Sequence, residues 1–288
     1  MLNRWLFILF FLPVIILAQD EKRLALVIGN AAYDKGPLKN PVNDALLVAK
    51  TLEQLNFEVI LDTNIVDKAA FTDKIIEFGD MRPDYDVGFV YYAGHGIQVG
   101  SENYLLPTKV EFKTQKHVVL KAMPVNEIMM YLTDITDQVN VLILDACRDN
   151  PFEGNWNLVR SGSSSGLAKM QAPTGTLIAF STRAGRTAPD GDGENSNYCL
   201  SLVKNMMLEG VSLDQVFRNV RAEVYKITNG EQQTEEATQL TGETFFLVKS
   251  HYKKQFALID SLILDENLDY RDNEKDKLLA LEIVSSIL

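Results

Sequence analysis

The segment VNVLILDAC, residues 139–147, is an apolar run that leads through Asp145 and Ala146 to Cys147. Its apolar residues do not alternate with polar ones, which is typical of a parallel strand buried on both faces. A second run, VGFVYYA at residues 87–93, is of the same kind and leads into GHG, with His95 at its centre. Ligands of open parallel sheets bind beyond the carboxyl ends of the strands. The two runs therefore predict one shared site that contains Cys147 and His95.

Outward from these two runs, the chain alternates between predicted strands and predicted helices. Further strands are predicted at residues 24–28, 57–61, 176–180 and 245–248, and a short hairpin at residues 97–106 turns at Gly100. Apolar residues at helical spacing predict helices over residues 41–55, 67–81, 124–135, 198–208 and 213–228. Residues 150–173 and 183–196 are polar, rich in Gly and Ser, and are predicted to be loops. This alternation indicates an α/β fold, with helices on both faces of a parallel sheet.

The two ends of the chain differ from this pattern. Arg4, the apolar residues 5–17 and the small Ala18 predict a signal peptide over residues 1–18. The apolar run is shorter than the roughly 20 residues that span a bilayer, so cleavage is favoured over an uncleaved anchor. We expect an exported bacterial protein, periplasmic or secreted, that meets a membrane only through this signal peptide. Residues 250–288 predict a helical, acidic extension that follows a domain over residues 19–249.

The charge of the chain limits the kinds of partner. The 288 residues carry a net charge of −11, and no cluster of Lys and Arg interrupts the acidic surface. Binding to phosphate groups needs such a cluster, so we expect no nucleic acid partner. The sequence leaves the oligomeric state open, with a monomer among the options.

A cysteine and a histidine brought together can perform nucleophilic catalysis. A thiol attacks a carbonyl group efficiently only as the thiolate, and an imidazole can take its proton and later protonate the leaving amine. The backbone amides of Gly96 and Cys147 can stabilise the oxyanion that forms. Taken alone, each residue has an ordinary structural reading, since a strand-end cysteine is usually a core residue and a histidine between glycines is usually part of a turn. Their joint placement favours catalysis.

The segments YYAGHG (residues 91–96) and LDACRDNPF (residues 144–152) resemble the caspase-like cysteine peptidases, family C14 of clan CD. The resemblance is nearest to the bacterial metacaspase and paracaspase branch. It extends over residues 24–248 through LALVIGNAAY, LKNPVNDA, GTLIAFST, DGDGENS and LTGETFF. It implies the caspase-like fold, in which a central, mostly parallel six-stranded sheet has helices on both faces. It also implies an endopeptidase with a Cys147–His95 dyad, which acts on a peptide or protein substrate.

The resemblance also implies a substrate preference. Caspases carry Gln two positions before the nucleophile and cut after Asp, whereas this chain has Asp145 there, as do the relatives that accept Arg or Lys. Asp44 matches a second acidic position of that branch, and Asp190 or Asp192 would add a third charge. Two carboxylates facing a pocket attract a cationic side chain and reject an anionic one. Asp44 can instead complement a helix dipole, and Asp145 can accept backbone hydrogen bonds.

Several alternatives stay open at this point. A caspase-fold scaffold without turnover, an Asp-specific peptidase and a thiol transferase compete with the Arg/Lys peptidase. Self-cleavage after Arg160 or Lys169 competes with an uncut linker. We expect no cofactor and no bound metal, because DGDGENS lacks the full pattern of a calcium loop. Cys147 and Cys199 are expected to be unbridged, although one disulfide between them is compatible with export.

Overall fold

The computed structural model describes residues 21–133, 138–147, 167–183 and 193–250, and of Cys147 it describes the backbone alone. The predicted signal peptide and nearly all of the predicted C-terminal extension lie outside these residues. The boundaries at residues 18 and 249 therefore stay predictions. In the part of the chain that is described, no helix is both long and apolar enough to cross a bilayer.

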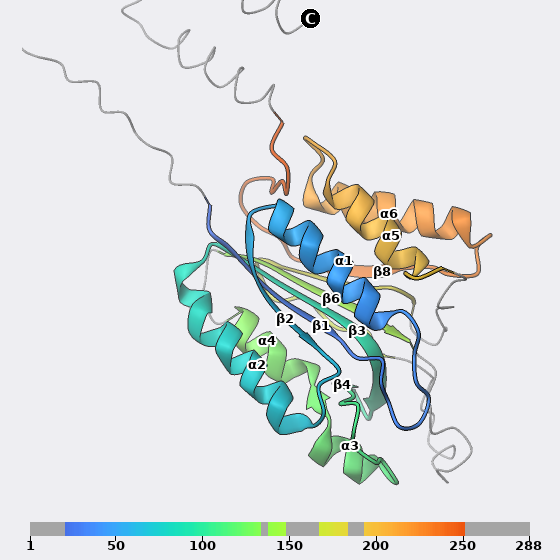
Figure 1. Ribbon diagram of the computed structural model, residues 1–288. Coiled ribbons are helices and arrows are strands. Elements are labelled where there is room, and N and C mark those ends of the chain that lie inside the picture. Colours follow the sequence, from blue (N-terminus) through green and yellow to red (C-terminus); the bar gives the residue numbers. More distant parts are fainter. Residues whose placement is uncertain (1–20, 134–137, 148–166, 184–192, 251–288) are drawn as a thin grey trace, which may run out of the picture.

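A sheet forms the centre of the fold (Figure 1), with six strands on its main path and two short strands off that path. The strand order is β2-β1-β3-β6-β7-β8, and every neighbouring pair is parallel except β7 with β8. This arrangement confirms the predicted α/β class with a mostly parallel sheet of six strands. The strands are β1 (Arg23–Gly29), β2 (Phe57–Thr63), β3 (Val87–Val99), β6 (Val139–Cys147), β7 (Thr176–Phe180) and β8 (Glu235–Thr238).

Helices cover both faces of the sheet, as predicted. Figure 1 shows the labelled helices lying on opposite sides of the strands. The first face carries α1 (Pro41–Gln54), α5 (Asn197–Met206) and α6 (Leu213–Ile227), and the second carries α2 (Lys68–Met81) and α4 (Val125–Thr133). The remaining elements are a short 3-10 helix (Arg82–Asp84), β4 (Glu102–Leu105), α3 (Gln115–Lys121) and β5 (Met123–Pro124).

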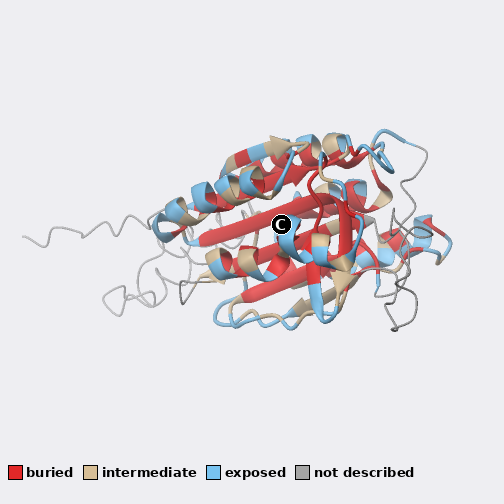
Figure 2. Cartoon of the chain, turned by 90° about the horizontal axis from the view of Figure 1, so that it is seen from below, coloured by how far each residue is buried: buried red, intermediate tan, exposed pale blue. Residues whose placement is uncertain are grey.

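The two covered faces explain why the strands lack polar alternation. In β1, Ala25 and Val27 pack in one core with α1, α5 and α6, whereas Leu26 and Ile28 pack in a second core with α2 and α4. Successive side chains of a strand point to opposite faces, so both sets must be apolar. Figure 2 shows the central strands in the buried colour, while the helices expose their outer sides.

The third strand is longer than the sequence predicts. An end at residue 93 was expected, but β3 continues through the GHG segment to Val99 and pairs with the antiparallel β4, with Gly96 opposite Leu105. The hairpin turns at Gly100, as expected. The extension matters for function because it places His95 inside a strand that is paired on both sides, not in a loop.

The predicted strand at residues 245–248 is wrong, because the sheet ends on β8, and Phe246 forms only an isolated bridge to Ser212. Packing explains the apolar character of this segment. Leu247 is buried in the core under α5 and α6, and Phe245 and Val248 pack against that core. The strand that does form, EEAT, is polar and lies at the edge of the sheet, so its sequence carries no buried-strand pattern.

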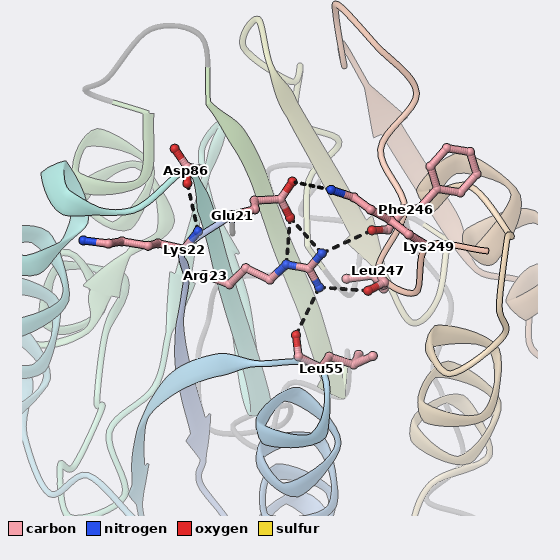
Figure 3. Close-up of polar contacts among 8 residues, drawn as sticks. All are labelled: Glu21, Lys22, Arg23, Leu55, Asp86, Phe246, Leu247 and Lys249. Carbon is pink, nitrogen blue, oxygen red and sulfur yellow. Dashed lines mark hydrogen bonds and ion pairs between the residues drawn. The ribbon is translucent and has the colours of Figure 1, made fainter. Parts of the chain in front are cut away.

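Arg23, at the start of β1, forms hydrogen bonds to the segment at residues 245–248 (Figure 3). One guanidinium nitrogen, Nη1, donates to the carbonyl oxygens of Leu55 at 3.0 Å and Leu247 at 2.8 Å. The Nε atom donates to Glu21 at 2.8 Å, and the guanidinium lies 5.5 Å from the Phe245 ring centroid. Arg23 is buried, so these acceptors replace the water that it loses. The contact lies at the amino end of β1, opposite to the predicted site.

Candidate active site

The register of β3 and β6 brings the two predicted catalytic residues side by side. His95 is the register partner of Cys147, and Ala93 is the partner of Asp145. Neighbouring strands of a sheet lie about 4.8 Å apart, so the two backbones are adjacent at the carboxyl end of the sheet. Gly96 follows His95 directly and is the register partner of Leu105 in β4. The two strands therefore end at the same edge of the sheet, as their sequences predict.

The His95 ring is held in one orientation. Its Nε2 atom lies 2.6 Å from the carbonyl oxygen of Gly36, and its ring centroid lies 4.4 Å from that of Tyr33. A carbonyl oxygen only accepts hydrogen bonds, so Nε2 must carry the proton of the neutral ring. Nδ1 is then the basic nitrogen. This arrangement suits a general base, because the proton-accepting atom is set by the surrounding fold.

Two tyrosine hydroxyls hold the backbone of His95. Its N–H donates to the Tyr33 hydroxyl at 2.9 Å, and its carbonyl oxygen accepts from the Tyr92 hydroxyl at 2.8 Å. Gly94 has a φ of +152°, and a Cβ added there would lie 2.7 Å from both of these hydroxyl oxygens. Only glycine has both the conformational freedom and the small size that this position needs.

Asp44 and Asp145 meet through Ser196, which the sequence analysis did not identify as a site residue. The backbone N–H of Ser196 donates to Asp44 Oδ1 at 3.0 Å, and its hydroxyl donates to Asp145 Oδ2 at 3.2 Å. Tyr91 donates to the same oxygen of Asp145 at 2.9 Å, and Asn195 donates to Asp44 at 2.8 Å. We call Asp44 and Asp145 the acidic pair. It joins α1, β6 and the start of α5 beside the predicted dyad.

The acidic pair is costly to ionise. Burial raises the pKa of Asp145 to about 7, and the negative charge of Asp44 contributes to this rise. Burial raises the pKa of Asp44 as well, although hydrogen bonds from Asn195 and Ser196 oppose it. Among the described residues, no Lys or Arg forms an ion pair with either carboxylate. Asp44 is buried and Asp145 is half-buried, and two such carboxylates with no ion-pair partner among the described residues favour the binding of a cation.

The other residues singled out in the sequence lie elsewhere. Asp190, Asp192 and Arg160 fall outside the described residues. Lys169 is exposed and forms an ion pair of 2.7 Å with Glu235. Cys199 is a free, buried thiol on α5 whose pKa is raised by burial, so it is unsuited to be a nucleophile. The described part of the chain holds no cluster of three or more His, Cys, Asp or Glu residues arranged to bind a metal ion.

The sequence held only a weak signal for the additional site residues. Ser196 precedes a helix, where its hydroxyl accepts from the N–H of Cys199 at 3.0 Å, and an N-cap is the usual role of such a serine. Tyr91 lies within an apolar strand, where an aromatic residue is expected to be part of the core. In both cases, only the three-dimensional arrangement shows that the hydroxyl reaches Asp145.

Three comparisons with known proteins agree with this architecture. The caspase domain family, Peptidase_C14, matches residues 22–245. The chain is 24% identical over 233 residues to mucosa-associated lymphoid tissue lymphoma translocation protein 1 of Homo sapiens. The aligned region covers 78% of this chain and 26% of that protein. The Mus musculus homolog is 29% identical over 135 residues, covering 46% of this chain and 15% of that protein. The chain thus spans about a quarter or less of the length of these relatives.

A solved structure shows the same fold. The crystal structure of caspase-1 from Spodoptera frugiperda superposes with a TM-score of 0.58 at 15% sequence identity. The superposition covers 80% of this chain and 93% of the caspase-1 chain. At this identity the likeness concerns the fold and leaves substrate preference to the local chemistry of the site.

Proposed function

The chain belongs to the caspase domain family of cysteine peptidases, and on this basis we propose that it is an endopeptidase that cuts after Arg or Lys. The observation that carries the proposal is the acidic pair. Asp44 is buried and Asp145 half-buried beside the His95–Cys147 register pair, and among the described residues their hydrogen bonds come from neutral groups. A cationic side chain that precedes the scissile bond would neutralise the pair.

In the proposed reaction, Cys147 is the nucleophile and His95 the general base. His95 takes the thiol proton on Nδ1, and the thiolate attacks the carbonyl carbon of the scissile bond. A C–S bond forms while the carbonyl electrons move to oxygen, where the N–H groups of Gly96 and Cys147 stabilise the charge. When the intermediate collapses, the C–N bond breaks and His95 gives its proton to the leaving nitrogen. Water, deprotonated by His95, then attacks the thioester carbon. The C–S bond breaks, the carboxylic acid product leaves, and the Cys147 thiolate regains the proton from His95.

The local contacts support the roles given to His95 and to the acidic pair. The hydrogen bond from His95 to the Gly36 carbonyl directs the basic nitrogen away from that carbonyl and steadies the imidazolium that forms. A guanidinium or ammonium group that enters the acidic pair gains charge-assisted hydrogen bonds. An Asp side chain would instead add a third negative charge to a buried site, which disfavours cleavage after Asp.

The proposed substrates are peptides or proteins with a basic residue before the scissile bond. Export, predicted from residues 1–18, would bring the enzyme to substrates in the periplasm or outside the cell. No nucleic acid partner is proposed, because the chain is acidic.

Hydrolysis of fluorogenic peptides tests the proposal. Peptidyl aminocoumarins that end in Arg, Lys or Asp are compared on the wild-type protein, on Cys147→Ala and on Cys199→Ala as the matched cysteine control. We expect turnover of the Arg and Lys peptides by the wild type and by Cys199→Ala, and none by Cys147→Ala. Absence of turnover of any peptide would favour the scaffold alternative, and cleavage of the Asp peptide alone would refute the role of the acidic pair.

A further inference from the structure

A cavity of about 290 Å³ lies against His95 and is separate from the acidic pair. Its walls come from the loop after β1, with Tyr33, and from the segment after β4, with Leu106 and Phe112. Neither Asp44 nor Asp145 lines it. In the sheet, β1 flanks β3 on one side and β6 flanks it on the other. The cavity therefore lies toward β1 and β4, whereas Asp145 lies on β6. We call this cavity the His95 cavity.

The walls of the His95 cavity are apolar and well supported. Tyr33, Leu106 and Phe112 are buried and belong to a small hydrophobic cluster that includes Ile97 of β3 and Val118 of α3. Because these side chains pack against each other, the shape of the cavity is set before any ligand binds. Pre-formed sites of this kind bind a ligand without the free-energy cost of a large rearrangement.

The charged side chains that line the cavity, Asp34, Lys35 and Glu111, all form ion pairs. Asp34 pairs with Lys109 at 2.7 Å, and Glu111 pairs with Lys113 at 3.0 Å and with Lys35 at 3.5 Å. These pairs are exposed to solvent, and the Glu111 carboxylate is shared by Lys35 and Lys113. Because these charged side chains are exposed and engaged in ion pairs, the buried apolar walls are the surface that a ligand can use.

We propose that the His95 cavity receives the side chain of the residue directly after the scissile bond, and that this residue is apolar and of the size of Leu or Phe. The inference rests on the proposed peptidase function and extends it to the leaving side of the substrate. An imidazole that protonates the leaving nitrogen must lie within hydrogen-bonding distance of it. The Cα of the leaving residue is about 1.5 Å from that nitrogen, so its side chain starts close to His95.

The two sites on either side of His95 then give the substrate a direction. The basic side chain before the scissile bond occupies the acidic pair on the side of β6, and the leaving residue crosses β3 toward the cavity. A volume of about 290 Å³ is small for a whole ligand, since typical ligand pockets measure about 300–1,000 Å³, but it suits a single large side chain. Burial of a Leu side chain is expected to favour cleavage over Gly by roughly 10- to 100-fold.

Internally quenched peptides test this inference. All carry Arg before the scissile bond, and the next residue is Gly, Ser, Leu, Phe, Asp or Lys. We expect kcat/KM for Leu and Phe to exceed that for Gly by about 10-fold or more, with Asp and Lys no better than Gly. An Arg aminocoumarin, which has no residue after the bond that is cut, reports on the proposed function separately.

Paired variants tie the preference to the cavity. Val110→Asp places a charge in the cavity wall and is expected to reduce the Leu-to-Gly ratio of kcat/KM at least 10-fold. Val119→Asp, on an exposed position of α3 outside the cavity, is expected to keep the wild-type ratio. A wild-type ratio near 1, or a ratio that survives Val110→Asp, would overturn the inference while the Arg aminocoumarin is still cleaved. If that compound is not cleaved, the proposed function and this inference fail together.

Discussion

Replacement of Asp145 by Asn removes one charge of the acidic pair while its size and its capacity to accept hydrogen bonds are retained. The amide oxygen can still accept from the hydroxyls of Tyr91 and Ser196, which contact the carboxylate at 2.9 and 3.2 Å. The change therefore isolates the charge from the packing. It is the sharpest single test of whether this carboxylate recognises a basic substrate.

The expected loss follows from the strength of a charge-assisted hydrogen bond. A hydrogen bond to a charged group contributes about 1.5–3 kcal/mol, which corresponds to roughly a 10- to 150-fold change in rate. We expect kcat/KM for Arg peptides to fall by that factor. Stability should not fall with it. Because burial raises the pKa of Asp145 from 3.8 to about 7, this group costs stability that grows as the pH rises between these two values and is complete above pH 7, and a neutral Asn avoids that cost.

The assay is a measurement of kcat/KM with an Arg aminocoumarin at pH 8, together with thermal unfolding of the same samples. Asp86→Asn serves as the charge control, because Asp86 is exposed and accepts a hydrogen bond from Lys22. We expect the control to keep wild-type activity and Asp145→Asn to unfold at no lower temperature than the wild type. A folded Asp145→Asn protein with unchanged kcat/KM for Arg peptides would refute the reasoning.

Three further predictions concern pH, the Arg23 contact and the GHG segment. The acid limb of kcat/KM for Arg peptides should lie near pH 7, since Asp145 must lose its proton to pair with the substrate. In Asp44→Asn this limb should move to lower pH, because the neighbouring negative charge is gone. The pH profiles of kcat/KM for the wild type and for Asp44→Asn test both expectations. Arg23→Ala removes the donor to the buried carbonyl groups of Leu55 and Leu247 and should lower the free energy of unfolding by about 2–4 kcal/mol in urea titrations. The kcat/KM of the folded protein should not change. A loss of stability below about 0.5 kcal/mol would contradict the stabilising role of the Arg23 contact. Gly94→Ala should lose more stability and activity than Gly100→Ala, because both have positive φ but only Gly94 meets neighbouring atoms; equal thermal shifts would exclude the steric argument.

The strands that carry the site could be predicted from the sequence because their apolar runs have few alternative explanations. The prediction for residues 176–180 matches β7, and that for residues 24–28 falls within one residue of each end of β1. The juxtaposition of His95 and Cys147 followed from the rule that parallel strands end at the same edge. The apolar runs could not show that β3 continues past His95, because glycines usually end a strand pattern. Here Gly94 lies within the strand and leaves room for the hydroxyl groups of Tyr33 and Tyr92.

The remaining features depend on contacts that no local pattern encodes. The edge strand β8 is polar, so the apolar residues 245–248 were a stronger but misleading candidate for the last strand. Their apolar character reflects packing under α5 and α6 and the carbonyl contacts of Arg23, which come from a residue more than 200 positions away. Ser196 joins Asp44 and Asp145 only because α1, β6 and α5 converge at one point.

Covalent labelling of the nucleophile tests the central claim most directly. The wild-type protein is treated with peptidyl chloromethyl ketones that end in Arg or in Asp, and the modified residue is identified by mass spectrometry. We predict an adduct on Cys147 with the Arg ketone, little reaction with the Asp ketone, no adduct on the buried Cys199, and a much slower reaction in His95→Ala. Modification of Cys199 in place of Cys147, or faster reaction of Cys147 with the Asp ketone than with the Arg ketone, would contradict the account.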